Sequence, residues 1–168
     1  MGSQDSAISC AVDAGAFYSG FVFQASSNQY CTTEEVFDEV KHIKRSHGAI
    51  EALLESNILH ILNPDRKSIE KATSAAIRSG DLPKLSGSDI SIIALALQLG
   101  ITLVTNDYAV ANVAMFMNIP VNSLVGKGIL RTRKWITYCS ACGRAFQANV
   151  KECRLCGNKL RRKYKLVK

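Results

Sequence analysis

Four cysteines place the strongest constraint on this 168-residue chain, because they lie within 18 residues as two pairs. Cys139 and Cys142 form one C-x2-C pair, Cys153 and Cys156 form the other, and a glycine follows each pair. Each pair presents two thiolates from one tight turn, as in closed tetrahedral zinc sites. Two redox dithiols are the alternative, but such a tandem among turn residues is unusual. We therefore predict one structural zinc ion.

The charge distribution divides the chain just before this cysteine module. Residues 1–126 carry 8 Lys and Arg against 13 Asp and Glu, a balance of −5. Residues 127–168 carry 13 Lys and Arg against Glu152 alone, a balance of +12, or about +10 once four thiolates and Zn²⁺ add −2. Such asymmetry indicates a polyanionic partner for the basic part. A basic tail that is merely solvated is the alternative.

The charge and cysteine patterns together suggest four segments. We expect a core domain at 7–125, a basic linker at 126–134, a zinc ribbon at 135–162 and a basic tail at 163–168. No apolar run approaches the ~18 residues that a membrane span requires, and the N-terminus lacks a signal-peptide pattern. Cys10 and Cys31 are isolated and indicate reduced thiols. We therefore expect a cytoplasmic protein.

The core domain alternates between strand and helix patterns. Apolar runs that predict strands lie at 7–12, 57–64, 101–104 and 119–124. Helical patterns lie at 32–45, 65–79, 86–100 and 107–117. This alternation implies an α/β fold, with a mostly parallel sheet flanked by helices.

Local signals fix some of the helix ends. Thr32 or Thr33 is expected to cap the first helix, and Gly80 ends the second. Ser88 is expected to cap the helix at 86–100, which Gly100 closes. That helix is apolar on nearly every side, which indicates that it is buried.

Four carboxylates occupy comparable places in this pattern. Asp13 follows the first strand, Asp107 follows the strand at 101–104, Asp89 opens the buried helix, and Glu39 lies on the helix after the two threonines. Strand ends and helix starts converge at one edge of a parallel sheet, so we expect these side chains to meet there. Clustered carboxylates repel one another unless a cation is present. Mg²⁺ and Mn²⁺ take oxygen ligands and can activate water for displacement at phosphorus.

Each carboxylate also has a purely structural interpretation. Asp89 and Asp107 suit helix N-termini, and Glu39 can be one charge on a solvated face beside Glu34. Asp13 is harder to explain this way, because a carboxylate between two apolar runs is costly to bury. The joint pattern favours a metal site.

Several motifs occur in the order and character of a PIN-domain nuclease: "VDAGAF", "TTEEVFDEVK", "LSGSDISIIALALQLG" and "VTNDYAVANV". Joined to "W-x3-C-x2-C-G-x9-C-x2-C-G" and a basic tail, the chain resembles the NIN-one-binding family of ribosome-biogenesis endonucleases over about residues 7–165. Its compact build resembles archaeal members more than eukaryotic ones.

The resemblance implies a metal-dependent endoribonuclease that cleaves precursor small-subunit rRNA to form its mature 3′ end. It implies a pre-ribosomal particle and ribosome assembly proteins as partners, and no membrane. By position, the catalytic ligands of Mg²⁺ or Mn²⁺ are Asp13, Glu39, Asp89 and Asp107, and the zinc ligands are the four paired cysteines. The chain departs from the family at Glu34, where proline is frequent, and at Asn106, where a second acidic residue is frequent.

The basic segment is expected to bind RNA phosphates through nine residues: Arg131, Arg133, Lys134, Arg144, Lys151, Arg154, Arg161, Arg162 and Lys163. Trp135 is expected to pack the ribbon against its neighbour instead of stacking a base.

Three other functions compete with a ribosomal nuclease. They are a non-catalytic RNA-binding assembly factor, a toxin-type PIN ribonuclease, and a zinc-ribbon transcription or translation factor. The last of these offers no explanation for the acidic core domain.

Overall fold

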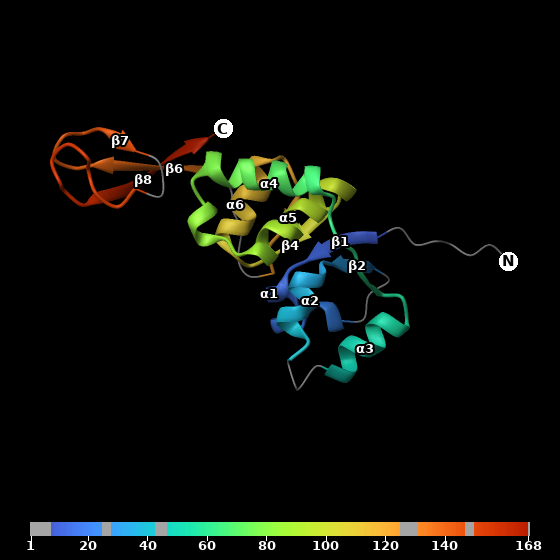
Figure 1. The fold of residues 1–168 in the computed structure, drawn as a ribbon. Helices are drawn as coiled ribbons and strands as arrows, with labels where there is room; N and C mark the ends of the chain where they lie inside the picture. The colour runs from blue at the N-terminus through green and yellow to red at the C-terminus, as the bar shows by residue number, and fades with distance from the viewer. Residues whose placement is uncertain (1–7, 25–27, 43–46, 125–130, 147–149, 168) are drawn as a thin grey trace.

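A computed structural model describes residues 8–24, 28–42, 47–124, 131–146 and 150–167. It contains a five-stranded sheet with the order β3-β2-β1-β4-β5, in which every neighbouring pair is parallel (Figure 1). Its strands are β1 (Ile8–Val12), β2 (Gln29–Thr32), β3 (Leu59–Ile61), β4 (Thr102–Val104) and β5 (Val121–Asn122). The predicted parallel sheet is confirmed.

Six α-helices and two 3-10 helices connect the described strands. The α-helices are α1 (Ala14–Tyr18), α2 (Glu34–Val40), α3 (His47–Glu55), α4 (Arg66–Ser79), α5 (Gly87–Leu99) and α6 (Tyr108–Phe116). The 3-10 helices are η1 (Phe21–Phe23) and η2 (Leu82–Lys84). Helices α4, α5 and α6 form one group, and α3 lies at the opposite end of the domain (Figure 1). Among the described residues, no helix is long and apolar enough to span a membrane.

The prediction that the helix at 86–100 is buried is confirmed. Ile92, Ile93, Ala94 and Leu95 of α5 are all buried, together with most of its remaining turns. A helix that is apolar all round must contact protein on every side. Helix α5 packs against α4, α6 and α2 as well as against the sheet, so it forms the centre of the core.

Some local predictions were wrong or incomplete. Ser86, not Ser88, caps α5, because Ser86 and Asp89 form a reciprocal capping box. Thr33 caps α2, as one of the two alternatives had it, and residues 43–45 of the predicted helix lie outside the described residues. The elements α1, β2 and α3 were not anticipated. The first two are only five and four residues long, too short for a periodic pattern to emerge.

The C-terminal part forms a second, antiparallel sheet with the order β7-β6-β8. It consists of β6 (Thr132–Cys139), β7 (Ala145–Phe146) and β8 (Leu160–Val167). The sheet extends beyond the segment expected for the ribbon, because β6 begins within the expected linker and β8 includes most of the expected tail. Pairing with β6 along the full length of β8 explains why residues 163–167 are a strand. Residues 125–130, which include most of the expected linker, lie outside the described residues.

Strand register divides the side chains of this sheet between two faces. Trp135 pairs with Tyr164, and Thr137 pairs with Arg162, so these four side chains share one face. The opposite face carries the residues between them: Lys134, Ile136 and Tyr138 on β6, and Arg161, Lys163 and Lys165 on β8. We call the first the docking face and the second the outer face.

Strand β6 is joined to the core domain by hydrogen bonds between its backbone and one side chain of α6. Asn112 of α6 is fully buried, and its amide accepts from the Arg133 N–H at 2.7 Å and donates to the Arg133 carbonyl at 2.8 Å. The same amide group donates to Asp81 at 2.6 Å. One side chain therefore holds β6 much as a neighbouring strand would, and its own position is fixed by a buried carboxylate.

Close packing at Gly80 completes the junction. Gly80 ends α4 in the left-handed conformation, with φ of +80°, and its carbonyl accepts from Arg162 at 2.6 Å. A Cβ at this position would lie 2.9 Å from both Cβ and the carbonyl oxygen of Trp135. Trp135 thus packs the ribbon against the core domain, as expected, and only glycine permits this approach.

We predict that Gly80→Ala destabilises the protein more than Gly100→Ala does. Both glycines end a helix at positive φ, but nothing lies within 4 Å of a Cβ at Gly100. The Gly100 variant should lose about 1 kcal/mol from backbone strain alone, and the Gly80 variant a further 1–3 kcal/mol from the clash. Urea unfolding measures both values, and equal losses would contradict the packing described for Trp135.

Candidate active site and metal centres

The parallel pairing of β1 with β4 determines where the candidate site lies. The strand order reverses between these neighbours, since the chain passes from β1 to β2 on one side and β4 pairs with β1 on the other. Ligands of open α/β sheets bind outside the carboxyl ends of strands at such a switch point. Val12 lies opposite Val104, so Asp13 and Thr105 are the first residues beyond the two strand ends.

Asp13 is the most constrained of the four carboxylates. It is only 7% exposed, and its Oδ1 accepts from the Ala16 N–H at 3.0 Å at the start of α1. Its Oδ2 accepts a short hydrogen bond from the Thr105 hydroxyl, which itself accepts from the Asp107 N–H at 3.0 Å. Thr105 therefore fixes the ends of β1 and β4 relative to each other.

Burial raises the pKa of Asp13 above its ordinary value of 3.8. The hydrogen bonds from Thr105 and Ala16 oppose this rise, and the negative charges of Asp89 and Asp107 add to it. Ionisation of Asp13 is therefore less favourable in the folded protein than in the unfolded chain. This is the electrostatic situation that a bound cation relieves.

Asp89 and Asp107 both take part in helix capping, so the expectation that they suit helix N-termini is correct. Oδ2 of Asp89 accepts from the backbone N–H and the hydroxyl of Ser86, each at 2.8 Å. Oδ1 of Asp107 accepts from Ala109 and Val110 at 2.6 and 3.1 Å. In the part of the chain that the structure describes, the second oxygen of each carboxylate accepts no hydrogen bond. Capping and ligand binding are thus compatible, because they use different oxygens.

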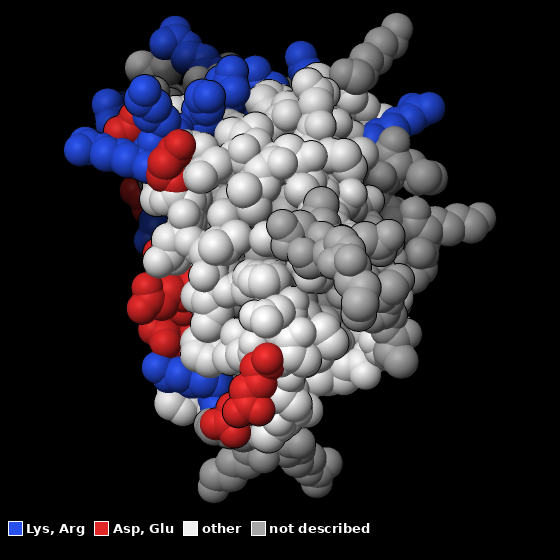
Figure 2. Space-filling model, turned by 90° about the vertical axis from the view of Figure 1, so that its right-hand side faces the viewer, with Lys and Arg blue, Asp and Glu red and all other residues white. Residues whose placement is uncertain are grey.

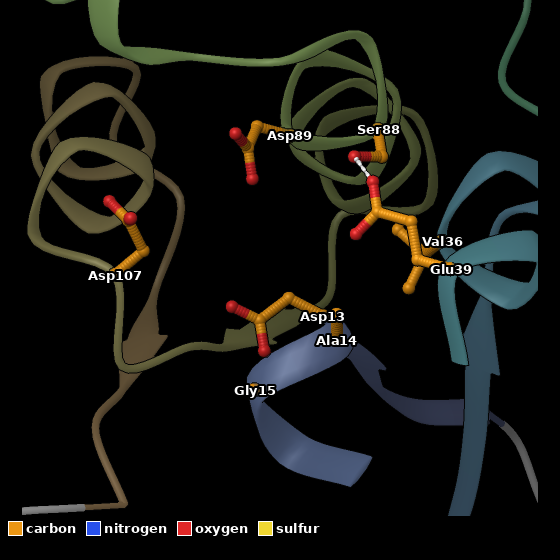
Figure 3. Close-up of a pocket in the computed structure, with 8 residues that line it drawn as sticks. All are labelled: Asp13, Ala14, Gly15, Val36, Glu39, Ser88, Asp89 and Asp107. Carbon is orange, nitrogen blue, oxygen red and sulfur yellow. Dashed lines mark hydrogen bonds between the residues drawn. The ribbon is translucent and has the colours of Figure 1, made fainter. Parts of the chain in front are cut away.

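Glu39 is held in the same manner from a different element. Its Oε1 accepts a short hydrogen bond from the Ser88 hydroxyl (Figure 3). The helices that carry these two residues are joined by a buried hydrogen bond of 2.7 Å between the hydroxyls of Thr33 and Ser91. These contacts bring α2 beside the N-terminus of α5 and explain why Glu39 lies at the site whereas Glu34 does not, since Glu34 bonds Asn63.

The four carboxylates point into one cavity of ≈ 300 Å³ (Figure 3). Its lining residues are Asp13, Ala14, Gly15, Val36, Glu39, Ser88, Asp89 and Asp107. The structure therefore brings together all four acidic residues that the sequence placed at this edge. Within the described ranges, no cationic side chain lines the cavity.

This donor set fits a hard divalent cation. Mg²⁺ commonly binds through one or two carboxylates and keeps several waters, so the acids need not converge on one point. Four carboxylates around one cavity meet that description, and those of Glu39, Asp89 and Asp107 each keep one oxygen without a hydrogen bond among the described residues. Among the described residues, only the four cysteines have ligand atoms that all lie within 4.8 Å of one another.

The cysteine cluster has the dimensions of a closed zinc site. Sγ of Cys139 lies 3.5 Å from Sγ of Cys156, and Sγ of Cys142 lies 3.7 Å from Sγ of Cys153. Zn–S bonds of about 2.3 Å in a tetrahedron require sulfur atoms about 3.8 Å apart. Backbone hydrogen bonding, first from Cys142, lowers the pKa of Cys139 to about 6, so a thiolate is available near neutral pH. All four predicted ligands meet as expected.

Cys10 and Cys31 take no part in either cluster. Both are free thiols on β1 and β2. Burial raises the pKa of Cys31 to about 12 and also raises that of Cys10. Protonated thiols in an apolar environment are poor nucleophiles and poor metal ligands, which agrees with their interpretation as reduced core residues.

The candidate RNA-binding residues are distributed over the ribbon sheet and its turns. Seven of the nine are exposed and, among the described residues, form no hydrogen bond or ion pair with a carboxylate or with the core domain. They are Arg131, Lys134, Arg144, Lys151, Arg154, Arg161 and Lys163. The two others, Arg133 and Arg162, lie on the docking face and contact the core domain.

The core domain carries a further group of basic residues, which was not anticipated and to which we assign no role in RNA binding. The face of the core domain in Figure 2 carries few charges, with Lys and Arg gathered at the level of α4. Lys67, Lys71 and Arg78 of that helix line an open groove with Phe116 and Met117.

Sequence reasoning also missed the residues that orient the carboxylates. Ser86, Ser88 and Thr105 each donate to an acid of the site. Thr105 gave a usable signal, since a polar residue at the end of a buried strand needs a partner. The hydroxyls of α5 gave none, because serine near a helix start already has a capping role.

Comparison with known proteins agrees with this geometry. A model of the PIN domain of ribonuclease matches residues 11–99, more than half of the chain. Endoribonuclease Nob1 of Methanothermobacter thermautotrophicus is 32% identical over 158 residues, which cover 90% of this chain and 91% of that protein.

The chain belongs to the Nob1 family of PIN-domain ribonucleases.

Two further relatives of this PIN-domain chain are informative. Endoribonuclease Nob1 of Methanocaldococcus jannaschii is 32% identical over 154 residues, covering 90% of this chain and 76% of that protein. Ribonuclease VapC1 of Thermoplasma acidophilum is 34% identical over 129 residues, covering 77% of this chain and 65% of that protein. The predicted family resemblance is confirmed.

The raised pKa of Asp13 leads to a prediction about stability without metal. A folded pKa above the unfolded value means that the folded state binds more protons, so stability falls as pH rises above 3.8 and through the folded pKa. Asp13→Asn should abolish that fall. Urea unfolding in EDTA across this pH range should show wild type losing stability relative to the variant, and Mg²⁺ should restore it.

Asp65 provides a control of opposite sign. It caps α4, and hydrogen bonding to Ser68 lowers its pKa. The stability it contributes is present above the unfolded pKa and is lost as pH falls through the folded one. Asp65→Asn should therefore be less stable than wild type near neutral pH, and the difference in their free energies of unfolding should shrink as the pH falls. If the free energy of unfolding depends on pH in the same way for wild type and Asp13→Asn, then Asp13 does not destabilise the metal-free protein as proposed.

The zinc geometry leads to a second prediction. Purified protein should contain about one zinc ion per chain, and Cys139→Ser or Cys156→Ser should lose it and unfold the ribbon sheet. A module of this size depends on its metal for folding free energy, whereas the core domain has its own apolar interior. Elemental analysis with far-UV circular dichroism measures both effects. Cys10→Ser is the control, and zinc retention by Cys139→Ser would exclude the assigned ligand set.

Proposed function

We propose that this chain is a divalent-metal-dependent endoribonuclease that cuts precursor small-subunit rRNA to form its mature 3′ end. The coarser part, endoribonuclease activity in rRNA processing, follows from membership of the Nob1 family. The cleavage position, the cytoplasm as its location, and assembly proteins of the pre-ribosomal particle as partners belong to the proposal. The observation that carries it is the convergence of four carboxylates from separate elements on one cavity at the switch point.

Asp13, Glu39, Asp89 and Asp107 would hold one or two Mg²⁺ or Mn²⁺ ions. When bound, such an ion lowers the pKa of water and stabilises the negative charge that develops during in-line displacement at phosphorus. Asp13, at the base of the cavity, is the carboxylate whose burial most requires a counter-charge. Asn106 contributes no negative charge beside Asp107; its side chain accepts from the Leu124 N–H instead.

The surrounding hydroxyls preorganise this site. Thr105 orients Asp13, Ser88 orients Glu39, and Ser86 orients Asp89. Each donor engages one carboxylate oxygen, and for Glu39 and Asp89 the other oxygen faces no competing donor in the described part of the chain. Groups that are already oriented require little reorganisation when charge develops in a transition state.

RNA affinity is assigned mainly to the C-terminal sheet. The core domain is acidic and the residues beyond 126 are strongly basic, so phosphate backbones favour the ribbon. The outer face carries Lys134, Arg161 and Lys163 in adjacent positions. Arg162 lies on the opposite face and donates to the Gly80 carbonyl. An RNA phosphate would therefore compete with Gly80 for the Arg162 guanidinium. The proposed functional division is a nuclease domain at 7–125 and a zinc ribbon at 135–162, whose sheet extends from residue 132 to residue 167.

A toxin-type ribonuclease is a second candidate, since ribonuclease VapC1 is 34% identical over 129 residues. Such an enzyme would share the acidic cavity but would not require the 3′ end of small-subunit rRNA. One experiment separates the two. An RNA that spans this 3′ end and a control RNA are each incubated with protein in Mn²⁺, Mg²⁺ or EDTA, and the products are mapped. A single metal-dependent cut at the mature end supports the proposal, and equal cutting of both RNAs favours the alternative.

Asp107→Asn should abolish this cleavage and leave RNA affinity within about twofold of wild type. Asparagine is a good N-cap and preserves α6, but it loses the charge that binds a cation. Asp65→Asn is the matched control, because Asp65 caps α4 through Ser68 without lining the cavity. Cleavage rate and equilibrium RNA binding are measured for both variants. Full cleavage by Asp107→Asn would place the active centre elsewhere.

A further inference from the structure

A series of rings and cations leads from the acidic cavity to the ribbon. Tyr108 follows Asp107 in the chain, and Cζ of Arg133 lies 4.6 Å from the centre of the Tyr108 ring. The same Cζ lies 4.5 Å from the ring centre of Tyr164 on β8. Tyr164 meets Trp135 edge to face at 5.3 Å. These contacts cross from the core domain to the docking face without interruption.

The position of Arg133 is determined by its backbone. Asn112 binds both its N–H and its carbonyl, so the guanidinium is delivered to Tyr108 by contacts independent of its own side chain. Among the described residues, no ion pair joins this guanidinium to a carboxylate and no hydrogen bond from it is found. A guanidinium has five N–H donors, and contacts with ring faces satisfy none of them.

The two tyrosines remain partly open to solvent. Tyr108 is 38% exposed and Tyr164 is 46% exposed, although both contact Arg133. Exposed aromatic faces beside an unpaired arginine combine the two features by which proteins hold single-stranded nucleic acid, base stacking and attraction of the phosphate backbone. A purely structural stack would be expected to bury its rings and to pair its charge.

We propose that Tyr108, Arg133 and Tyr164 form a binding subsite for single-stranded RNA beside the cavity. Arg133 binds a backbone phosphate next to the one that is cut, and the exposed tyrosine rings stack neighbouring bases. The proposal rests on the proposed nuclease function for its ligand. In this proposal Arg133 binds RNA close to the cavity, whereas the cations of the outer face bind RNA at a distance from it.

Adjacency to Asp107 favours RNA over an acidic protein segment as the ligand. Tyr108 and Asp107 are consecutive, so their Cα atoms are about 3.8 Å apart, which is less than the spacing of successive nucleotides. A strand bound in the cavity can therefore reach Tyr108 within one or two nucleotides. The docked ribbon thus supplies part of the substrate path and is more than a separate tether.

The test measures binding of a short fluorescent single-stranded RNA in EDTA, where no cleavage occurs, at several salt concentrations. Arg133→Met should flatten the slope of log affinity against log salt by about 0.7, and weaken binding about fivefold at 0.1 M salt. Arg133→Lys should retain the slope, since it keeps the charge. Tyr164→Leu should weaken binding at every salt concentration, and Tyr164→Phe should not.

Arg78→Met is the matched control. Cζ of Arg78 lies 5.7 Å from the ring centre of Phe116, at the opposite end of α6 from Tyr108. The substitution therefore removes an equivalent charge and ring contact about 12 Å along the helix, and should leave affinity and slope unchanged. Zinc content and urea unfolding verify that the ribbon remains folded in each variant.

The outcomes separate this subsite from the nuclease assignment. Equal slopes and affinities for wild type, Arg133→Met and Tyr164→Leu would overturn the subsite, even if the RNA is cleaved in Mn²⁺. An equal loss in Arg78→Met would also overturn it, because the effect would then be one of net charge. Loss confined to Arg133→Met and Tyr164→Leu supports it, even if wild type fails to cut the rRNA 3′ end.

Discussion

The pairing of β1 with β4 is the interaction on which the candidate site depends. It brings the ends of two strands that are some ninety residues apart in sequence to one point, where Asp13 and Thr105 become neighbours. Because the strand order reverses there, no crossover helix covers the edge, and a cavity remains. Helices α5 and α6 then direct Asp89 and Asp107 into that cavity from their first turns.

The same arrangement opposes folding of the metal-free protein. Three aspartates and a glutamate share one cavity, and burial raises the pKa of Asp13 while its neighbours add to the effect. The hydrogen bonds from Thr105, Ser86 and Ser88 offset part of the desolvation cost, since each satisfies one carboxylate oxygen. One oxygen each of Glu39, Asp89 and Asp107 accepts no hydrogen bond among the described residues. A site that is strained without its ligand is a common feature of catalytic centres.

The ribbon is integrated into the protein through one of its two faces. Asn112, Gly80 and Trp135 join the docking face to α4 and α6, and the outer face keeps its cations in solvent. The alternation of a β-strand produces this division, since successive side chains point in opposite directions. Within the run Arg161-Arg162-Lys163, the middle residue therefore serves docking while the outer two remain available for a polyanion.

The sequence by itself determined the two cysteine pairs that come together, the parallel α/β fold and the four acidic residues. Cysteine pairing and strand–helix alternation are local patterns whose physical causes act within a few residues. Tertiary structure alone decided what orients the acids and what the ribbon touches. Ser88 meets Glu39 across 49 positions, and Asn112 meets Arg133 across 21. Such contacts depend on how elements pack, and a serine, an asparagine or a tyrosine has the same local preferences whether or not a partner lies opposite it.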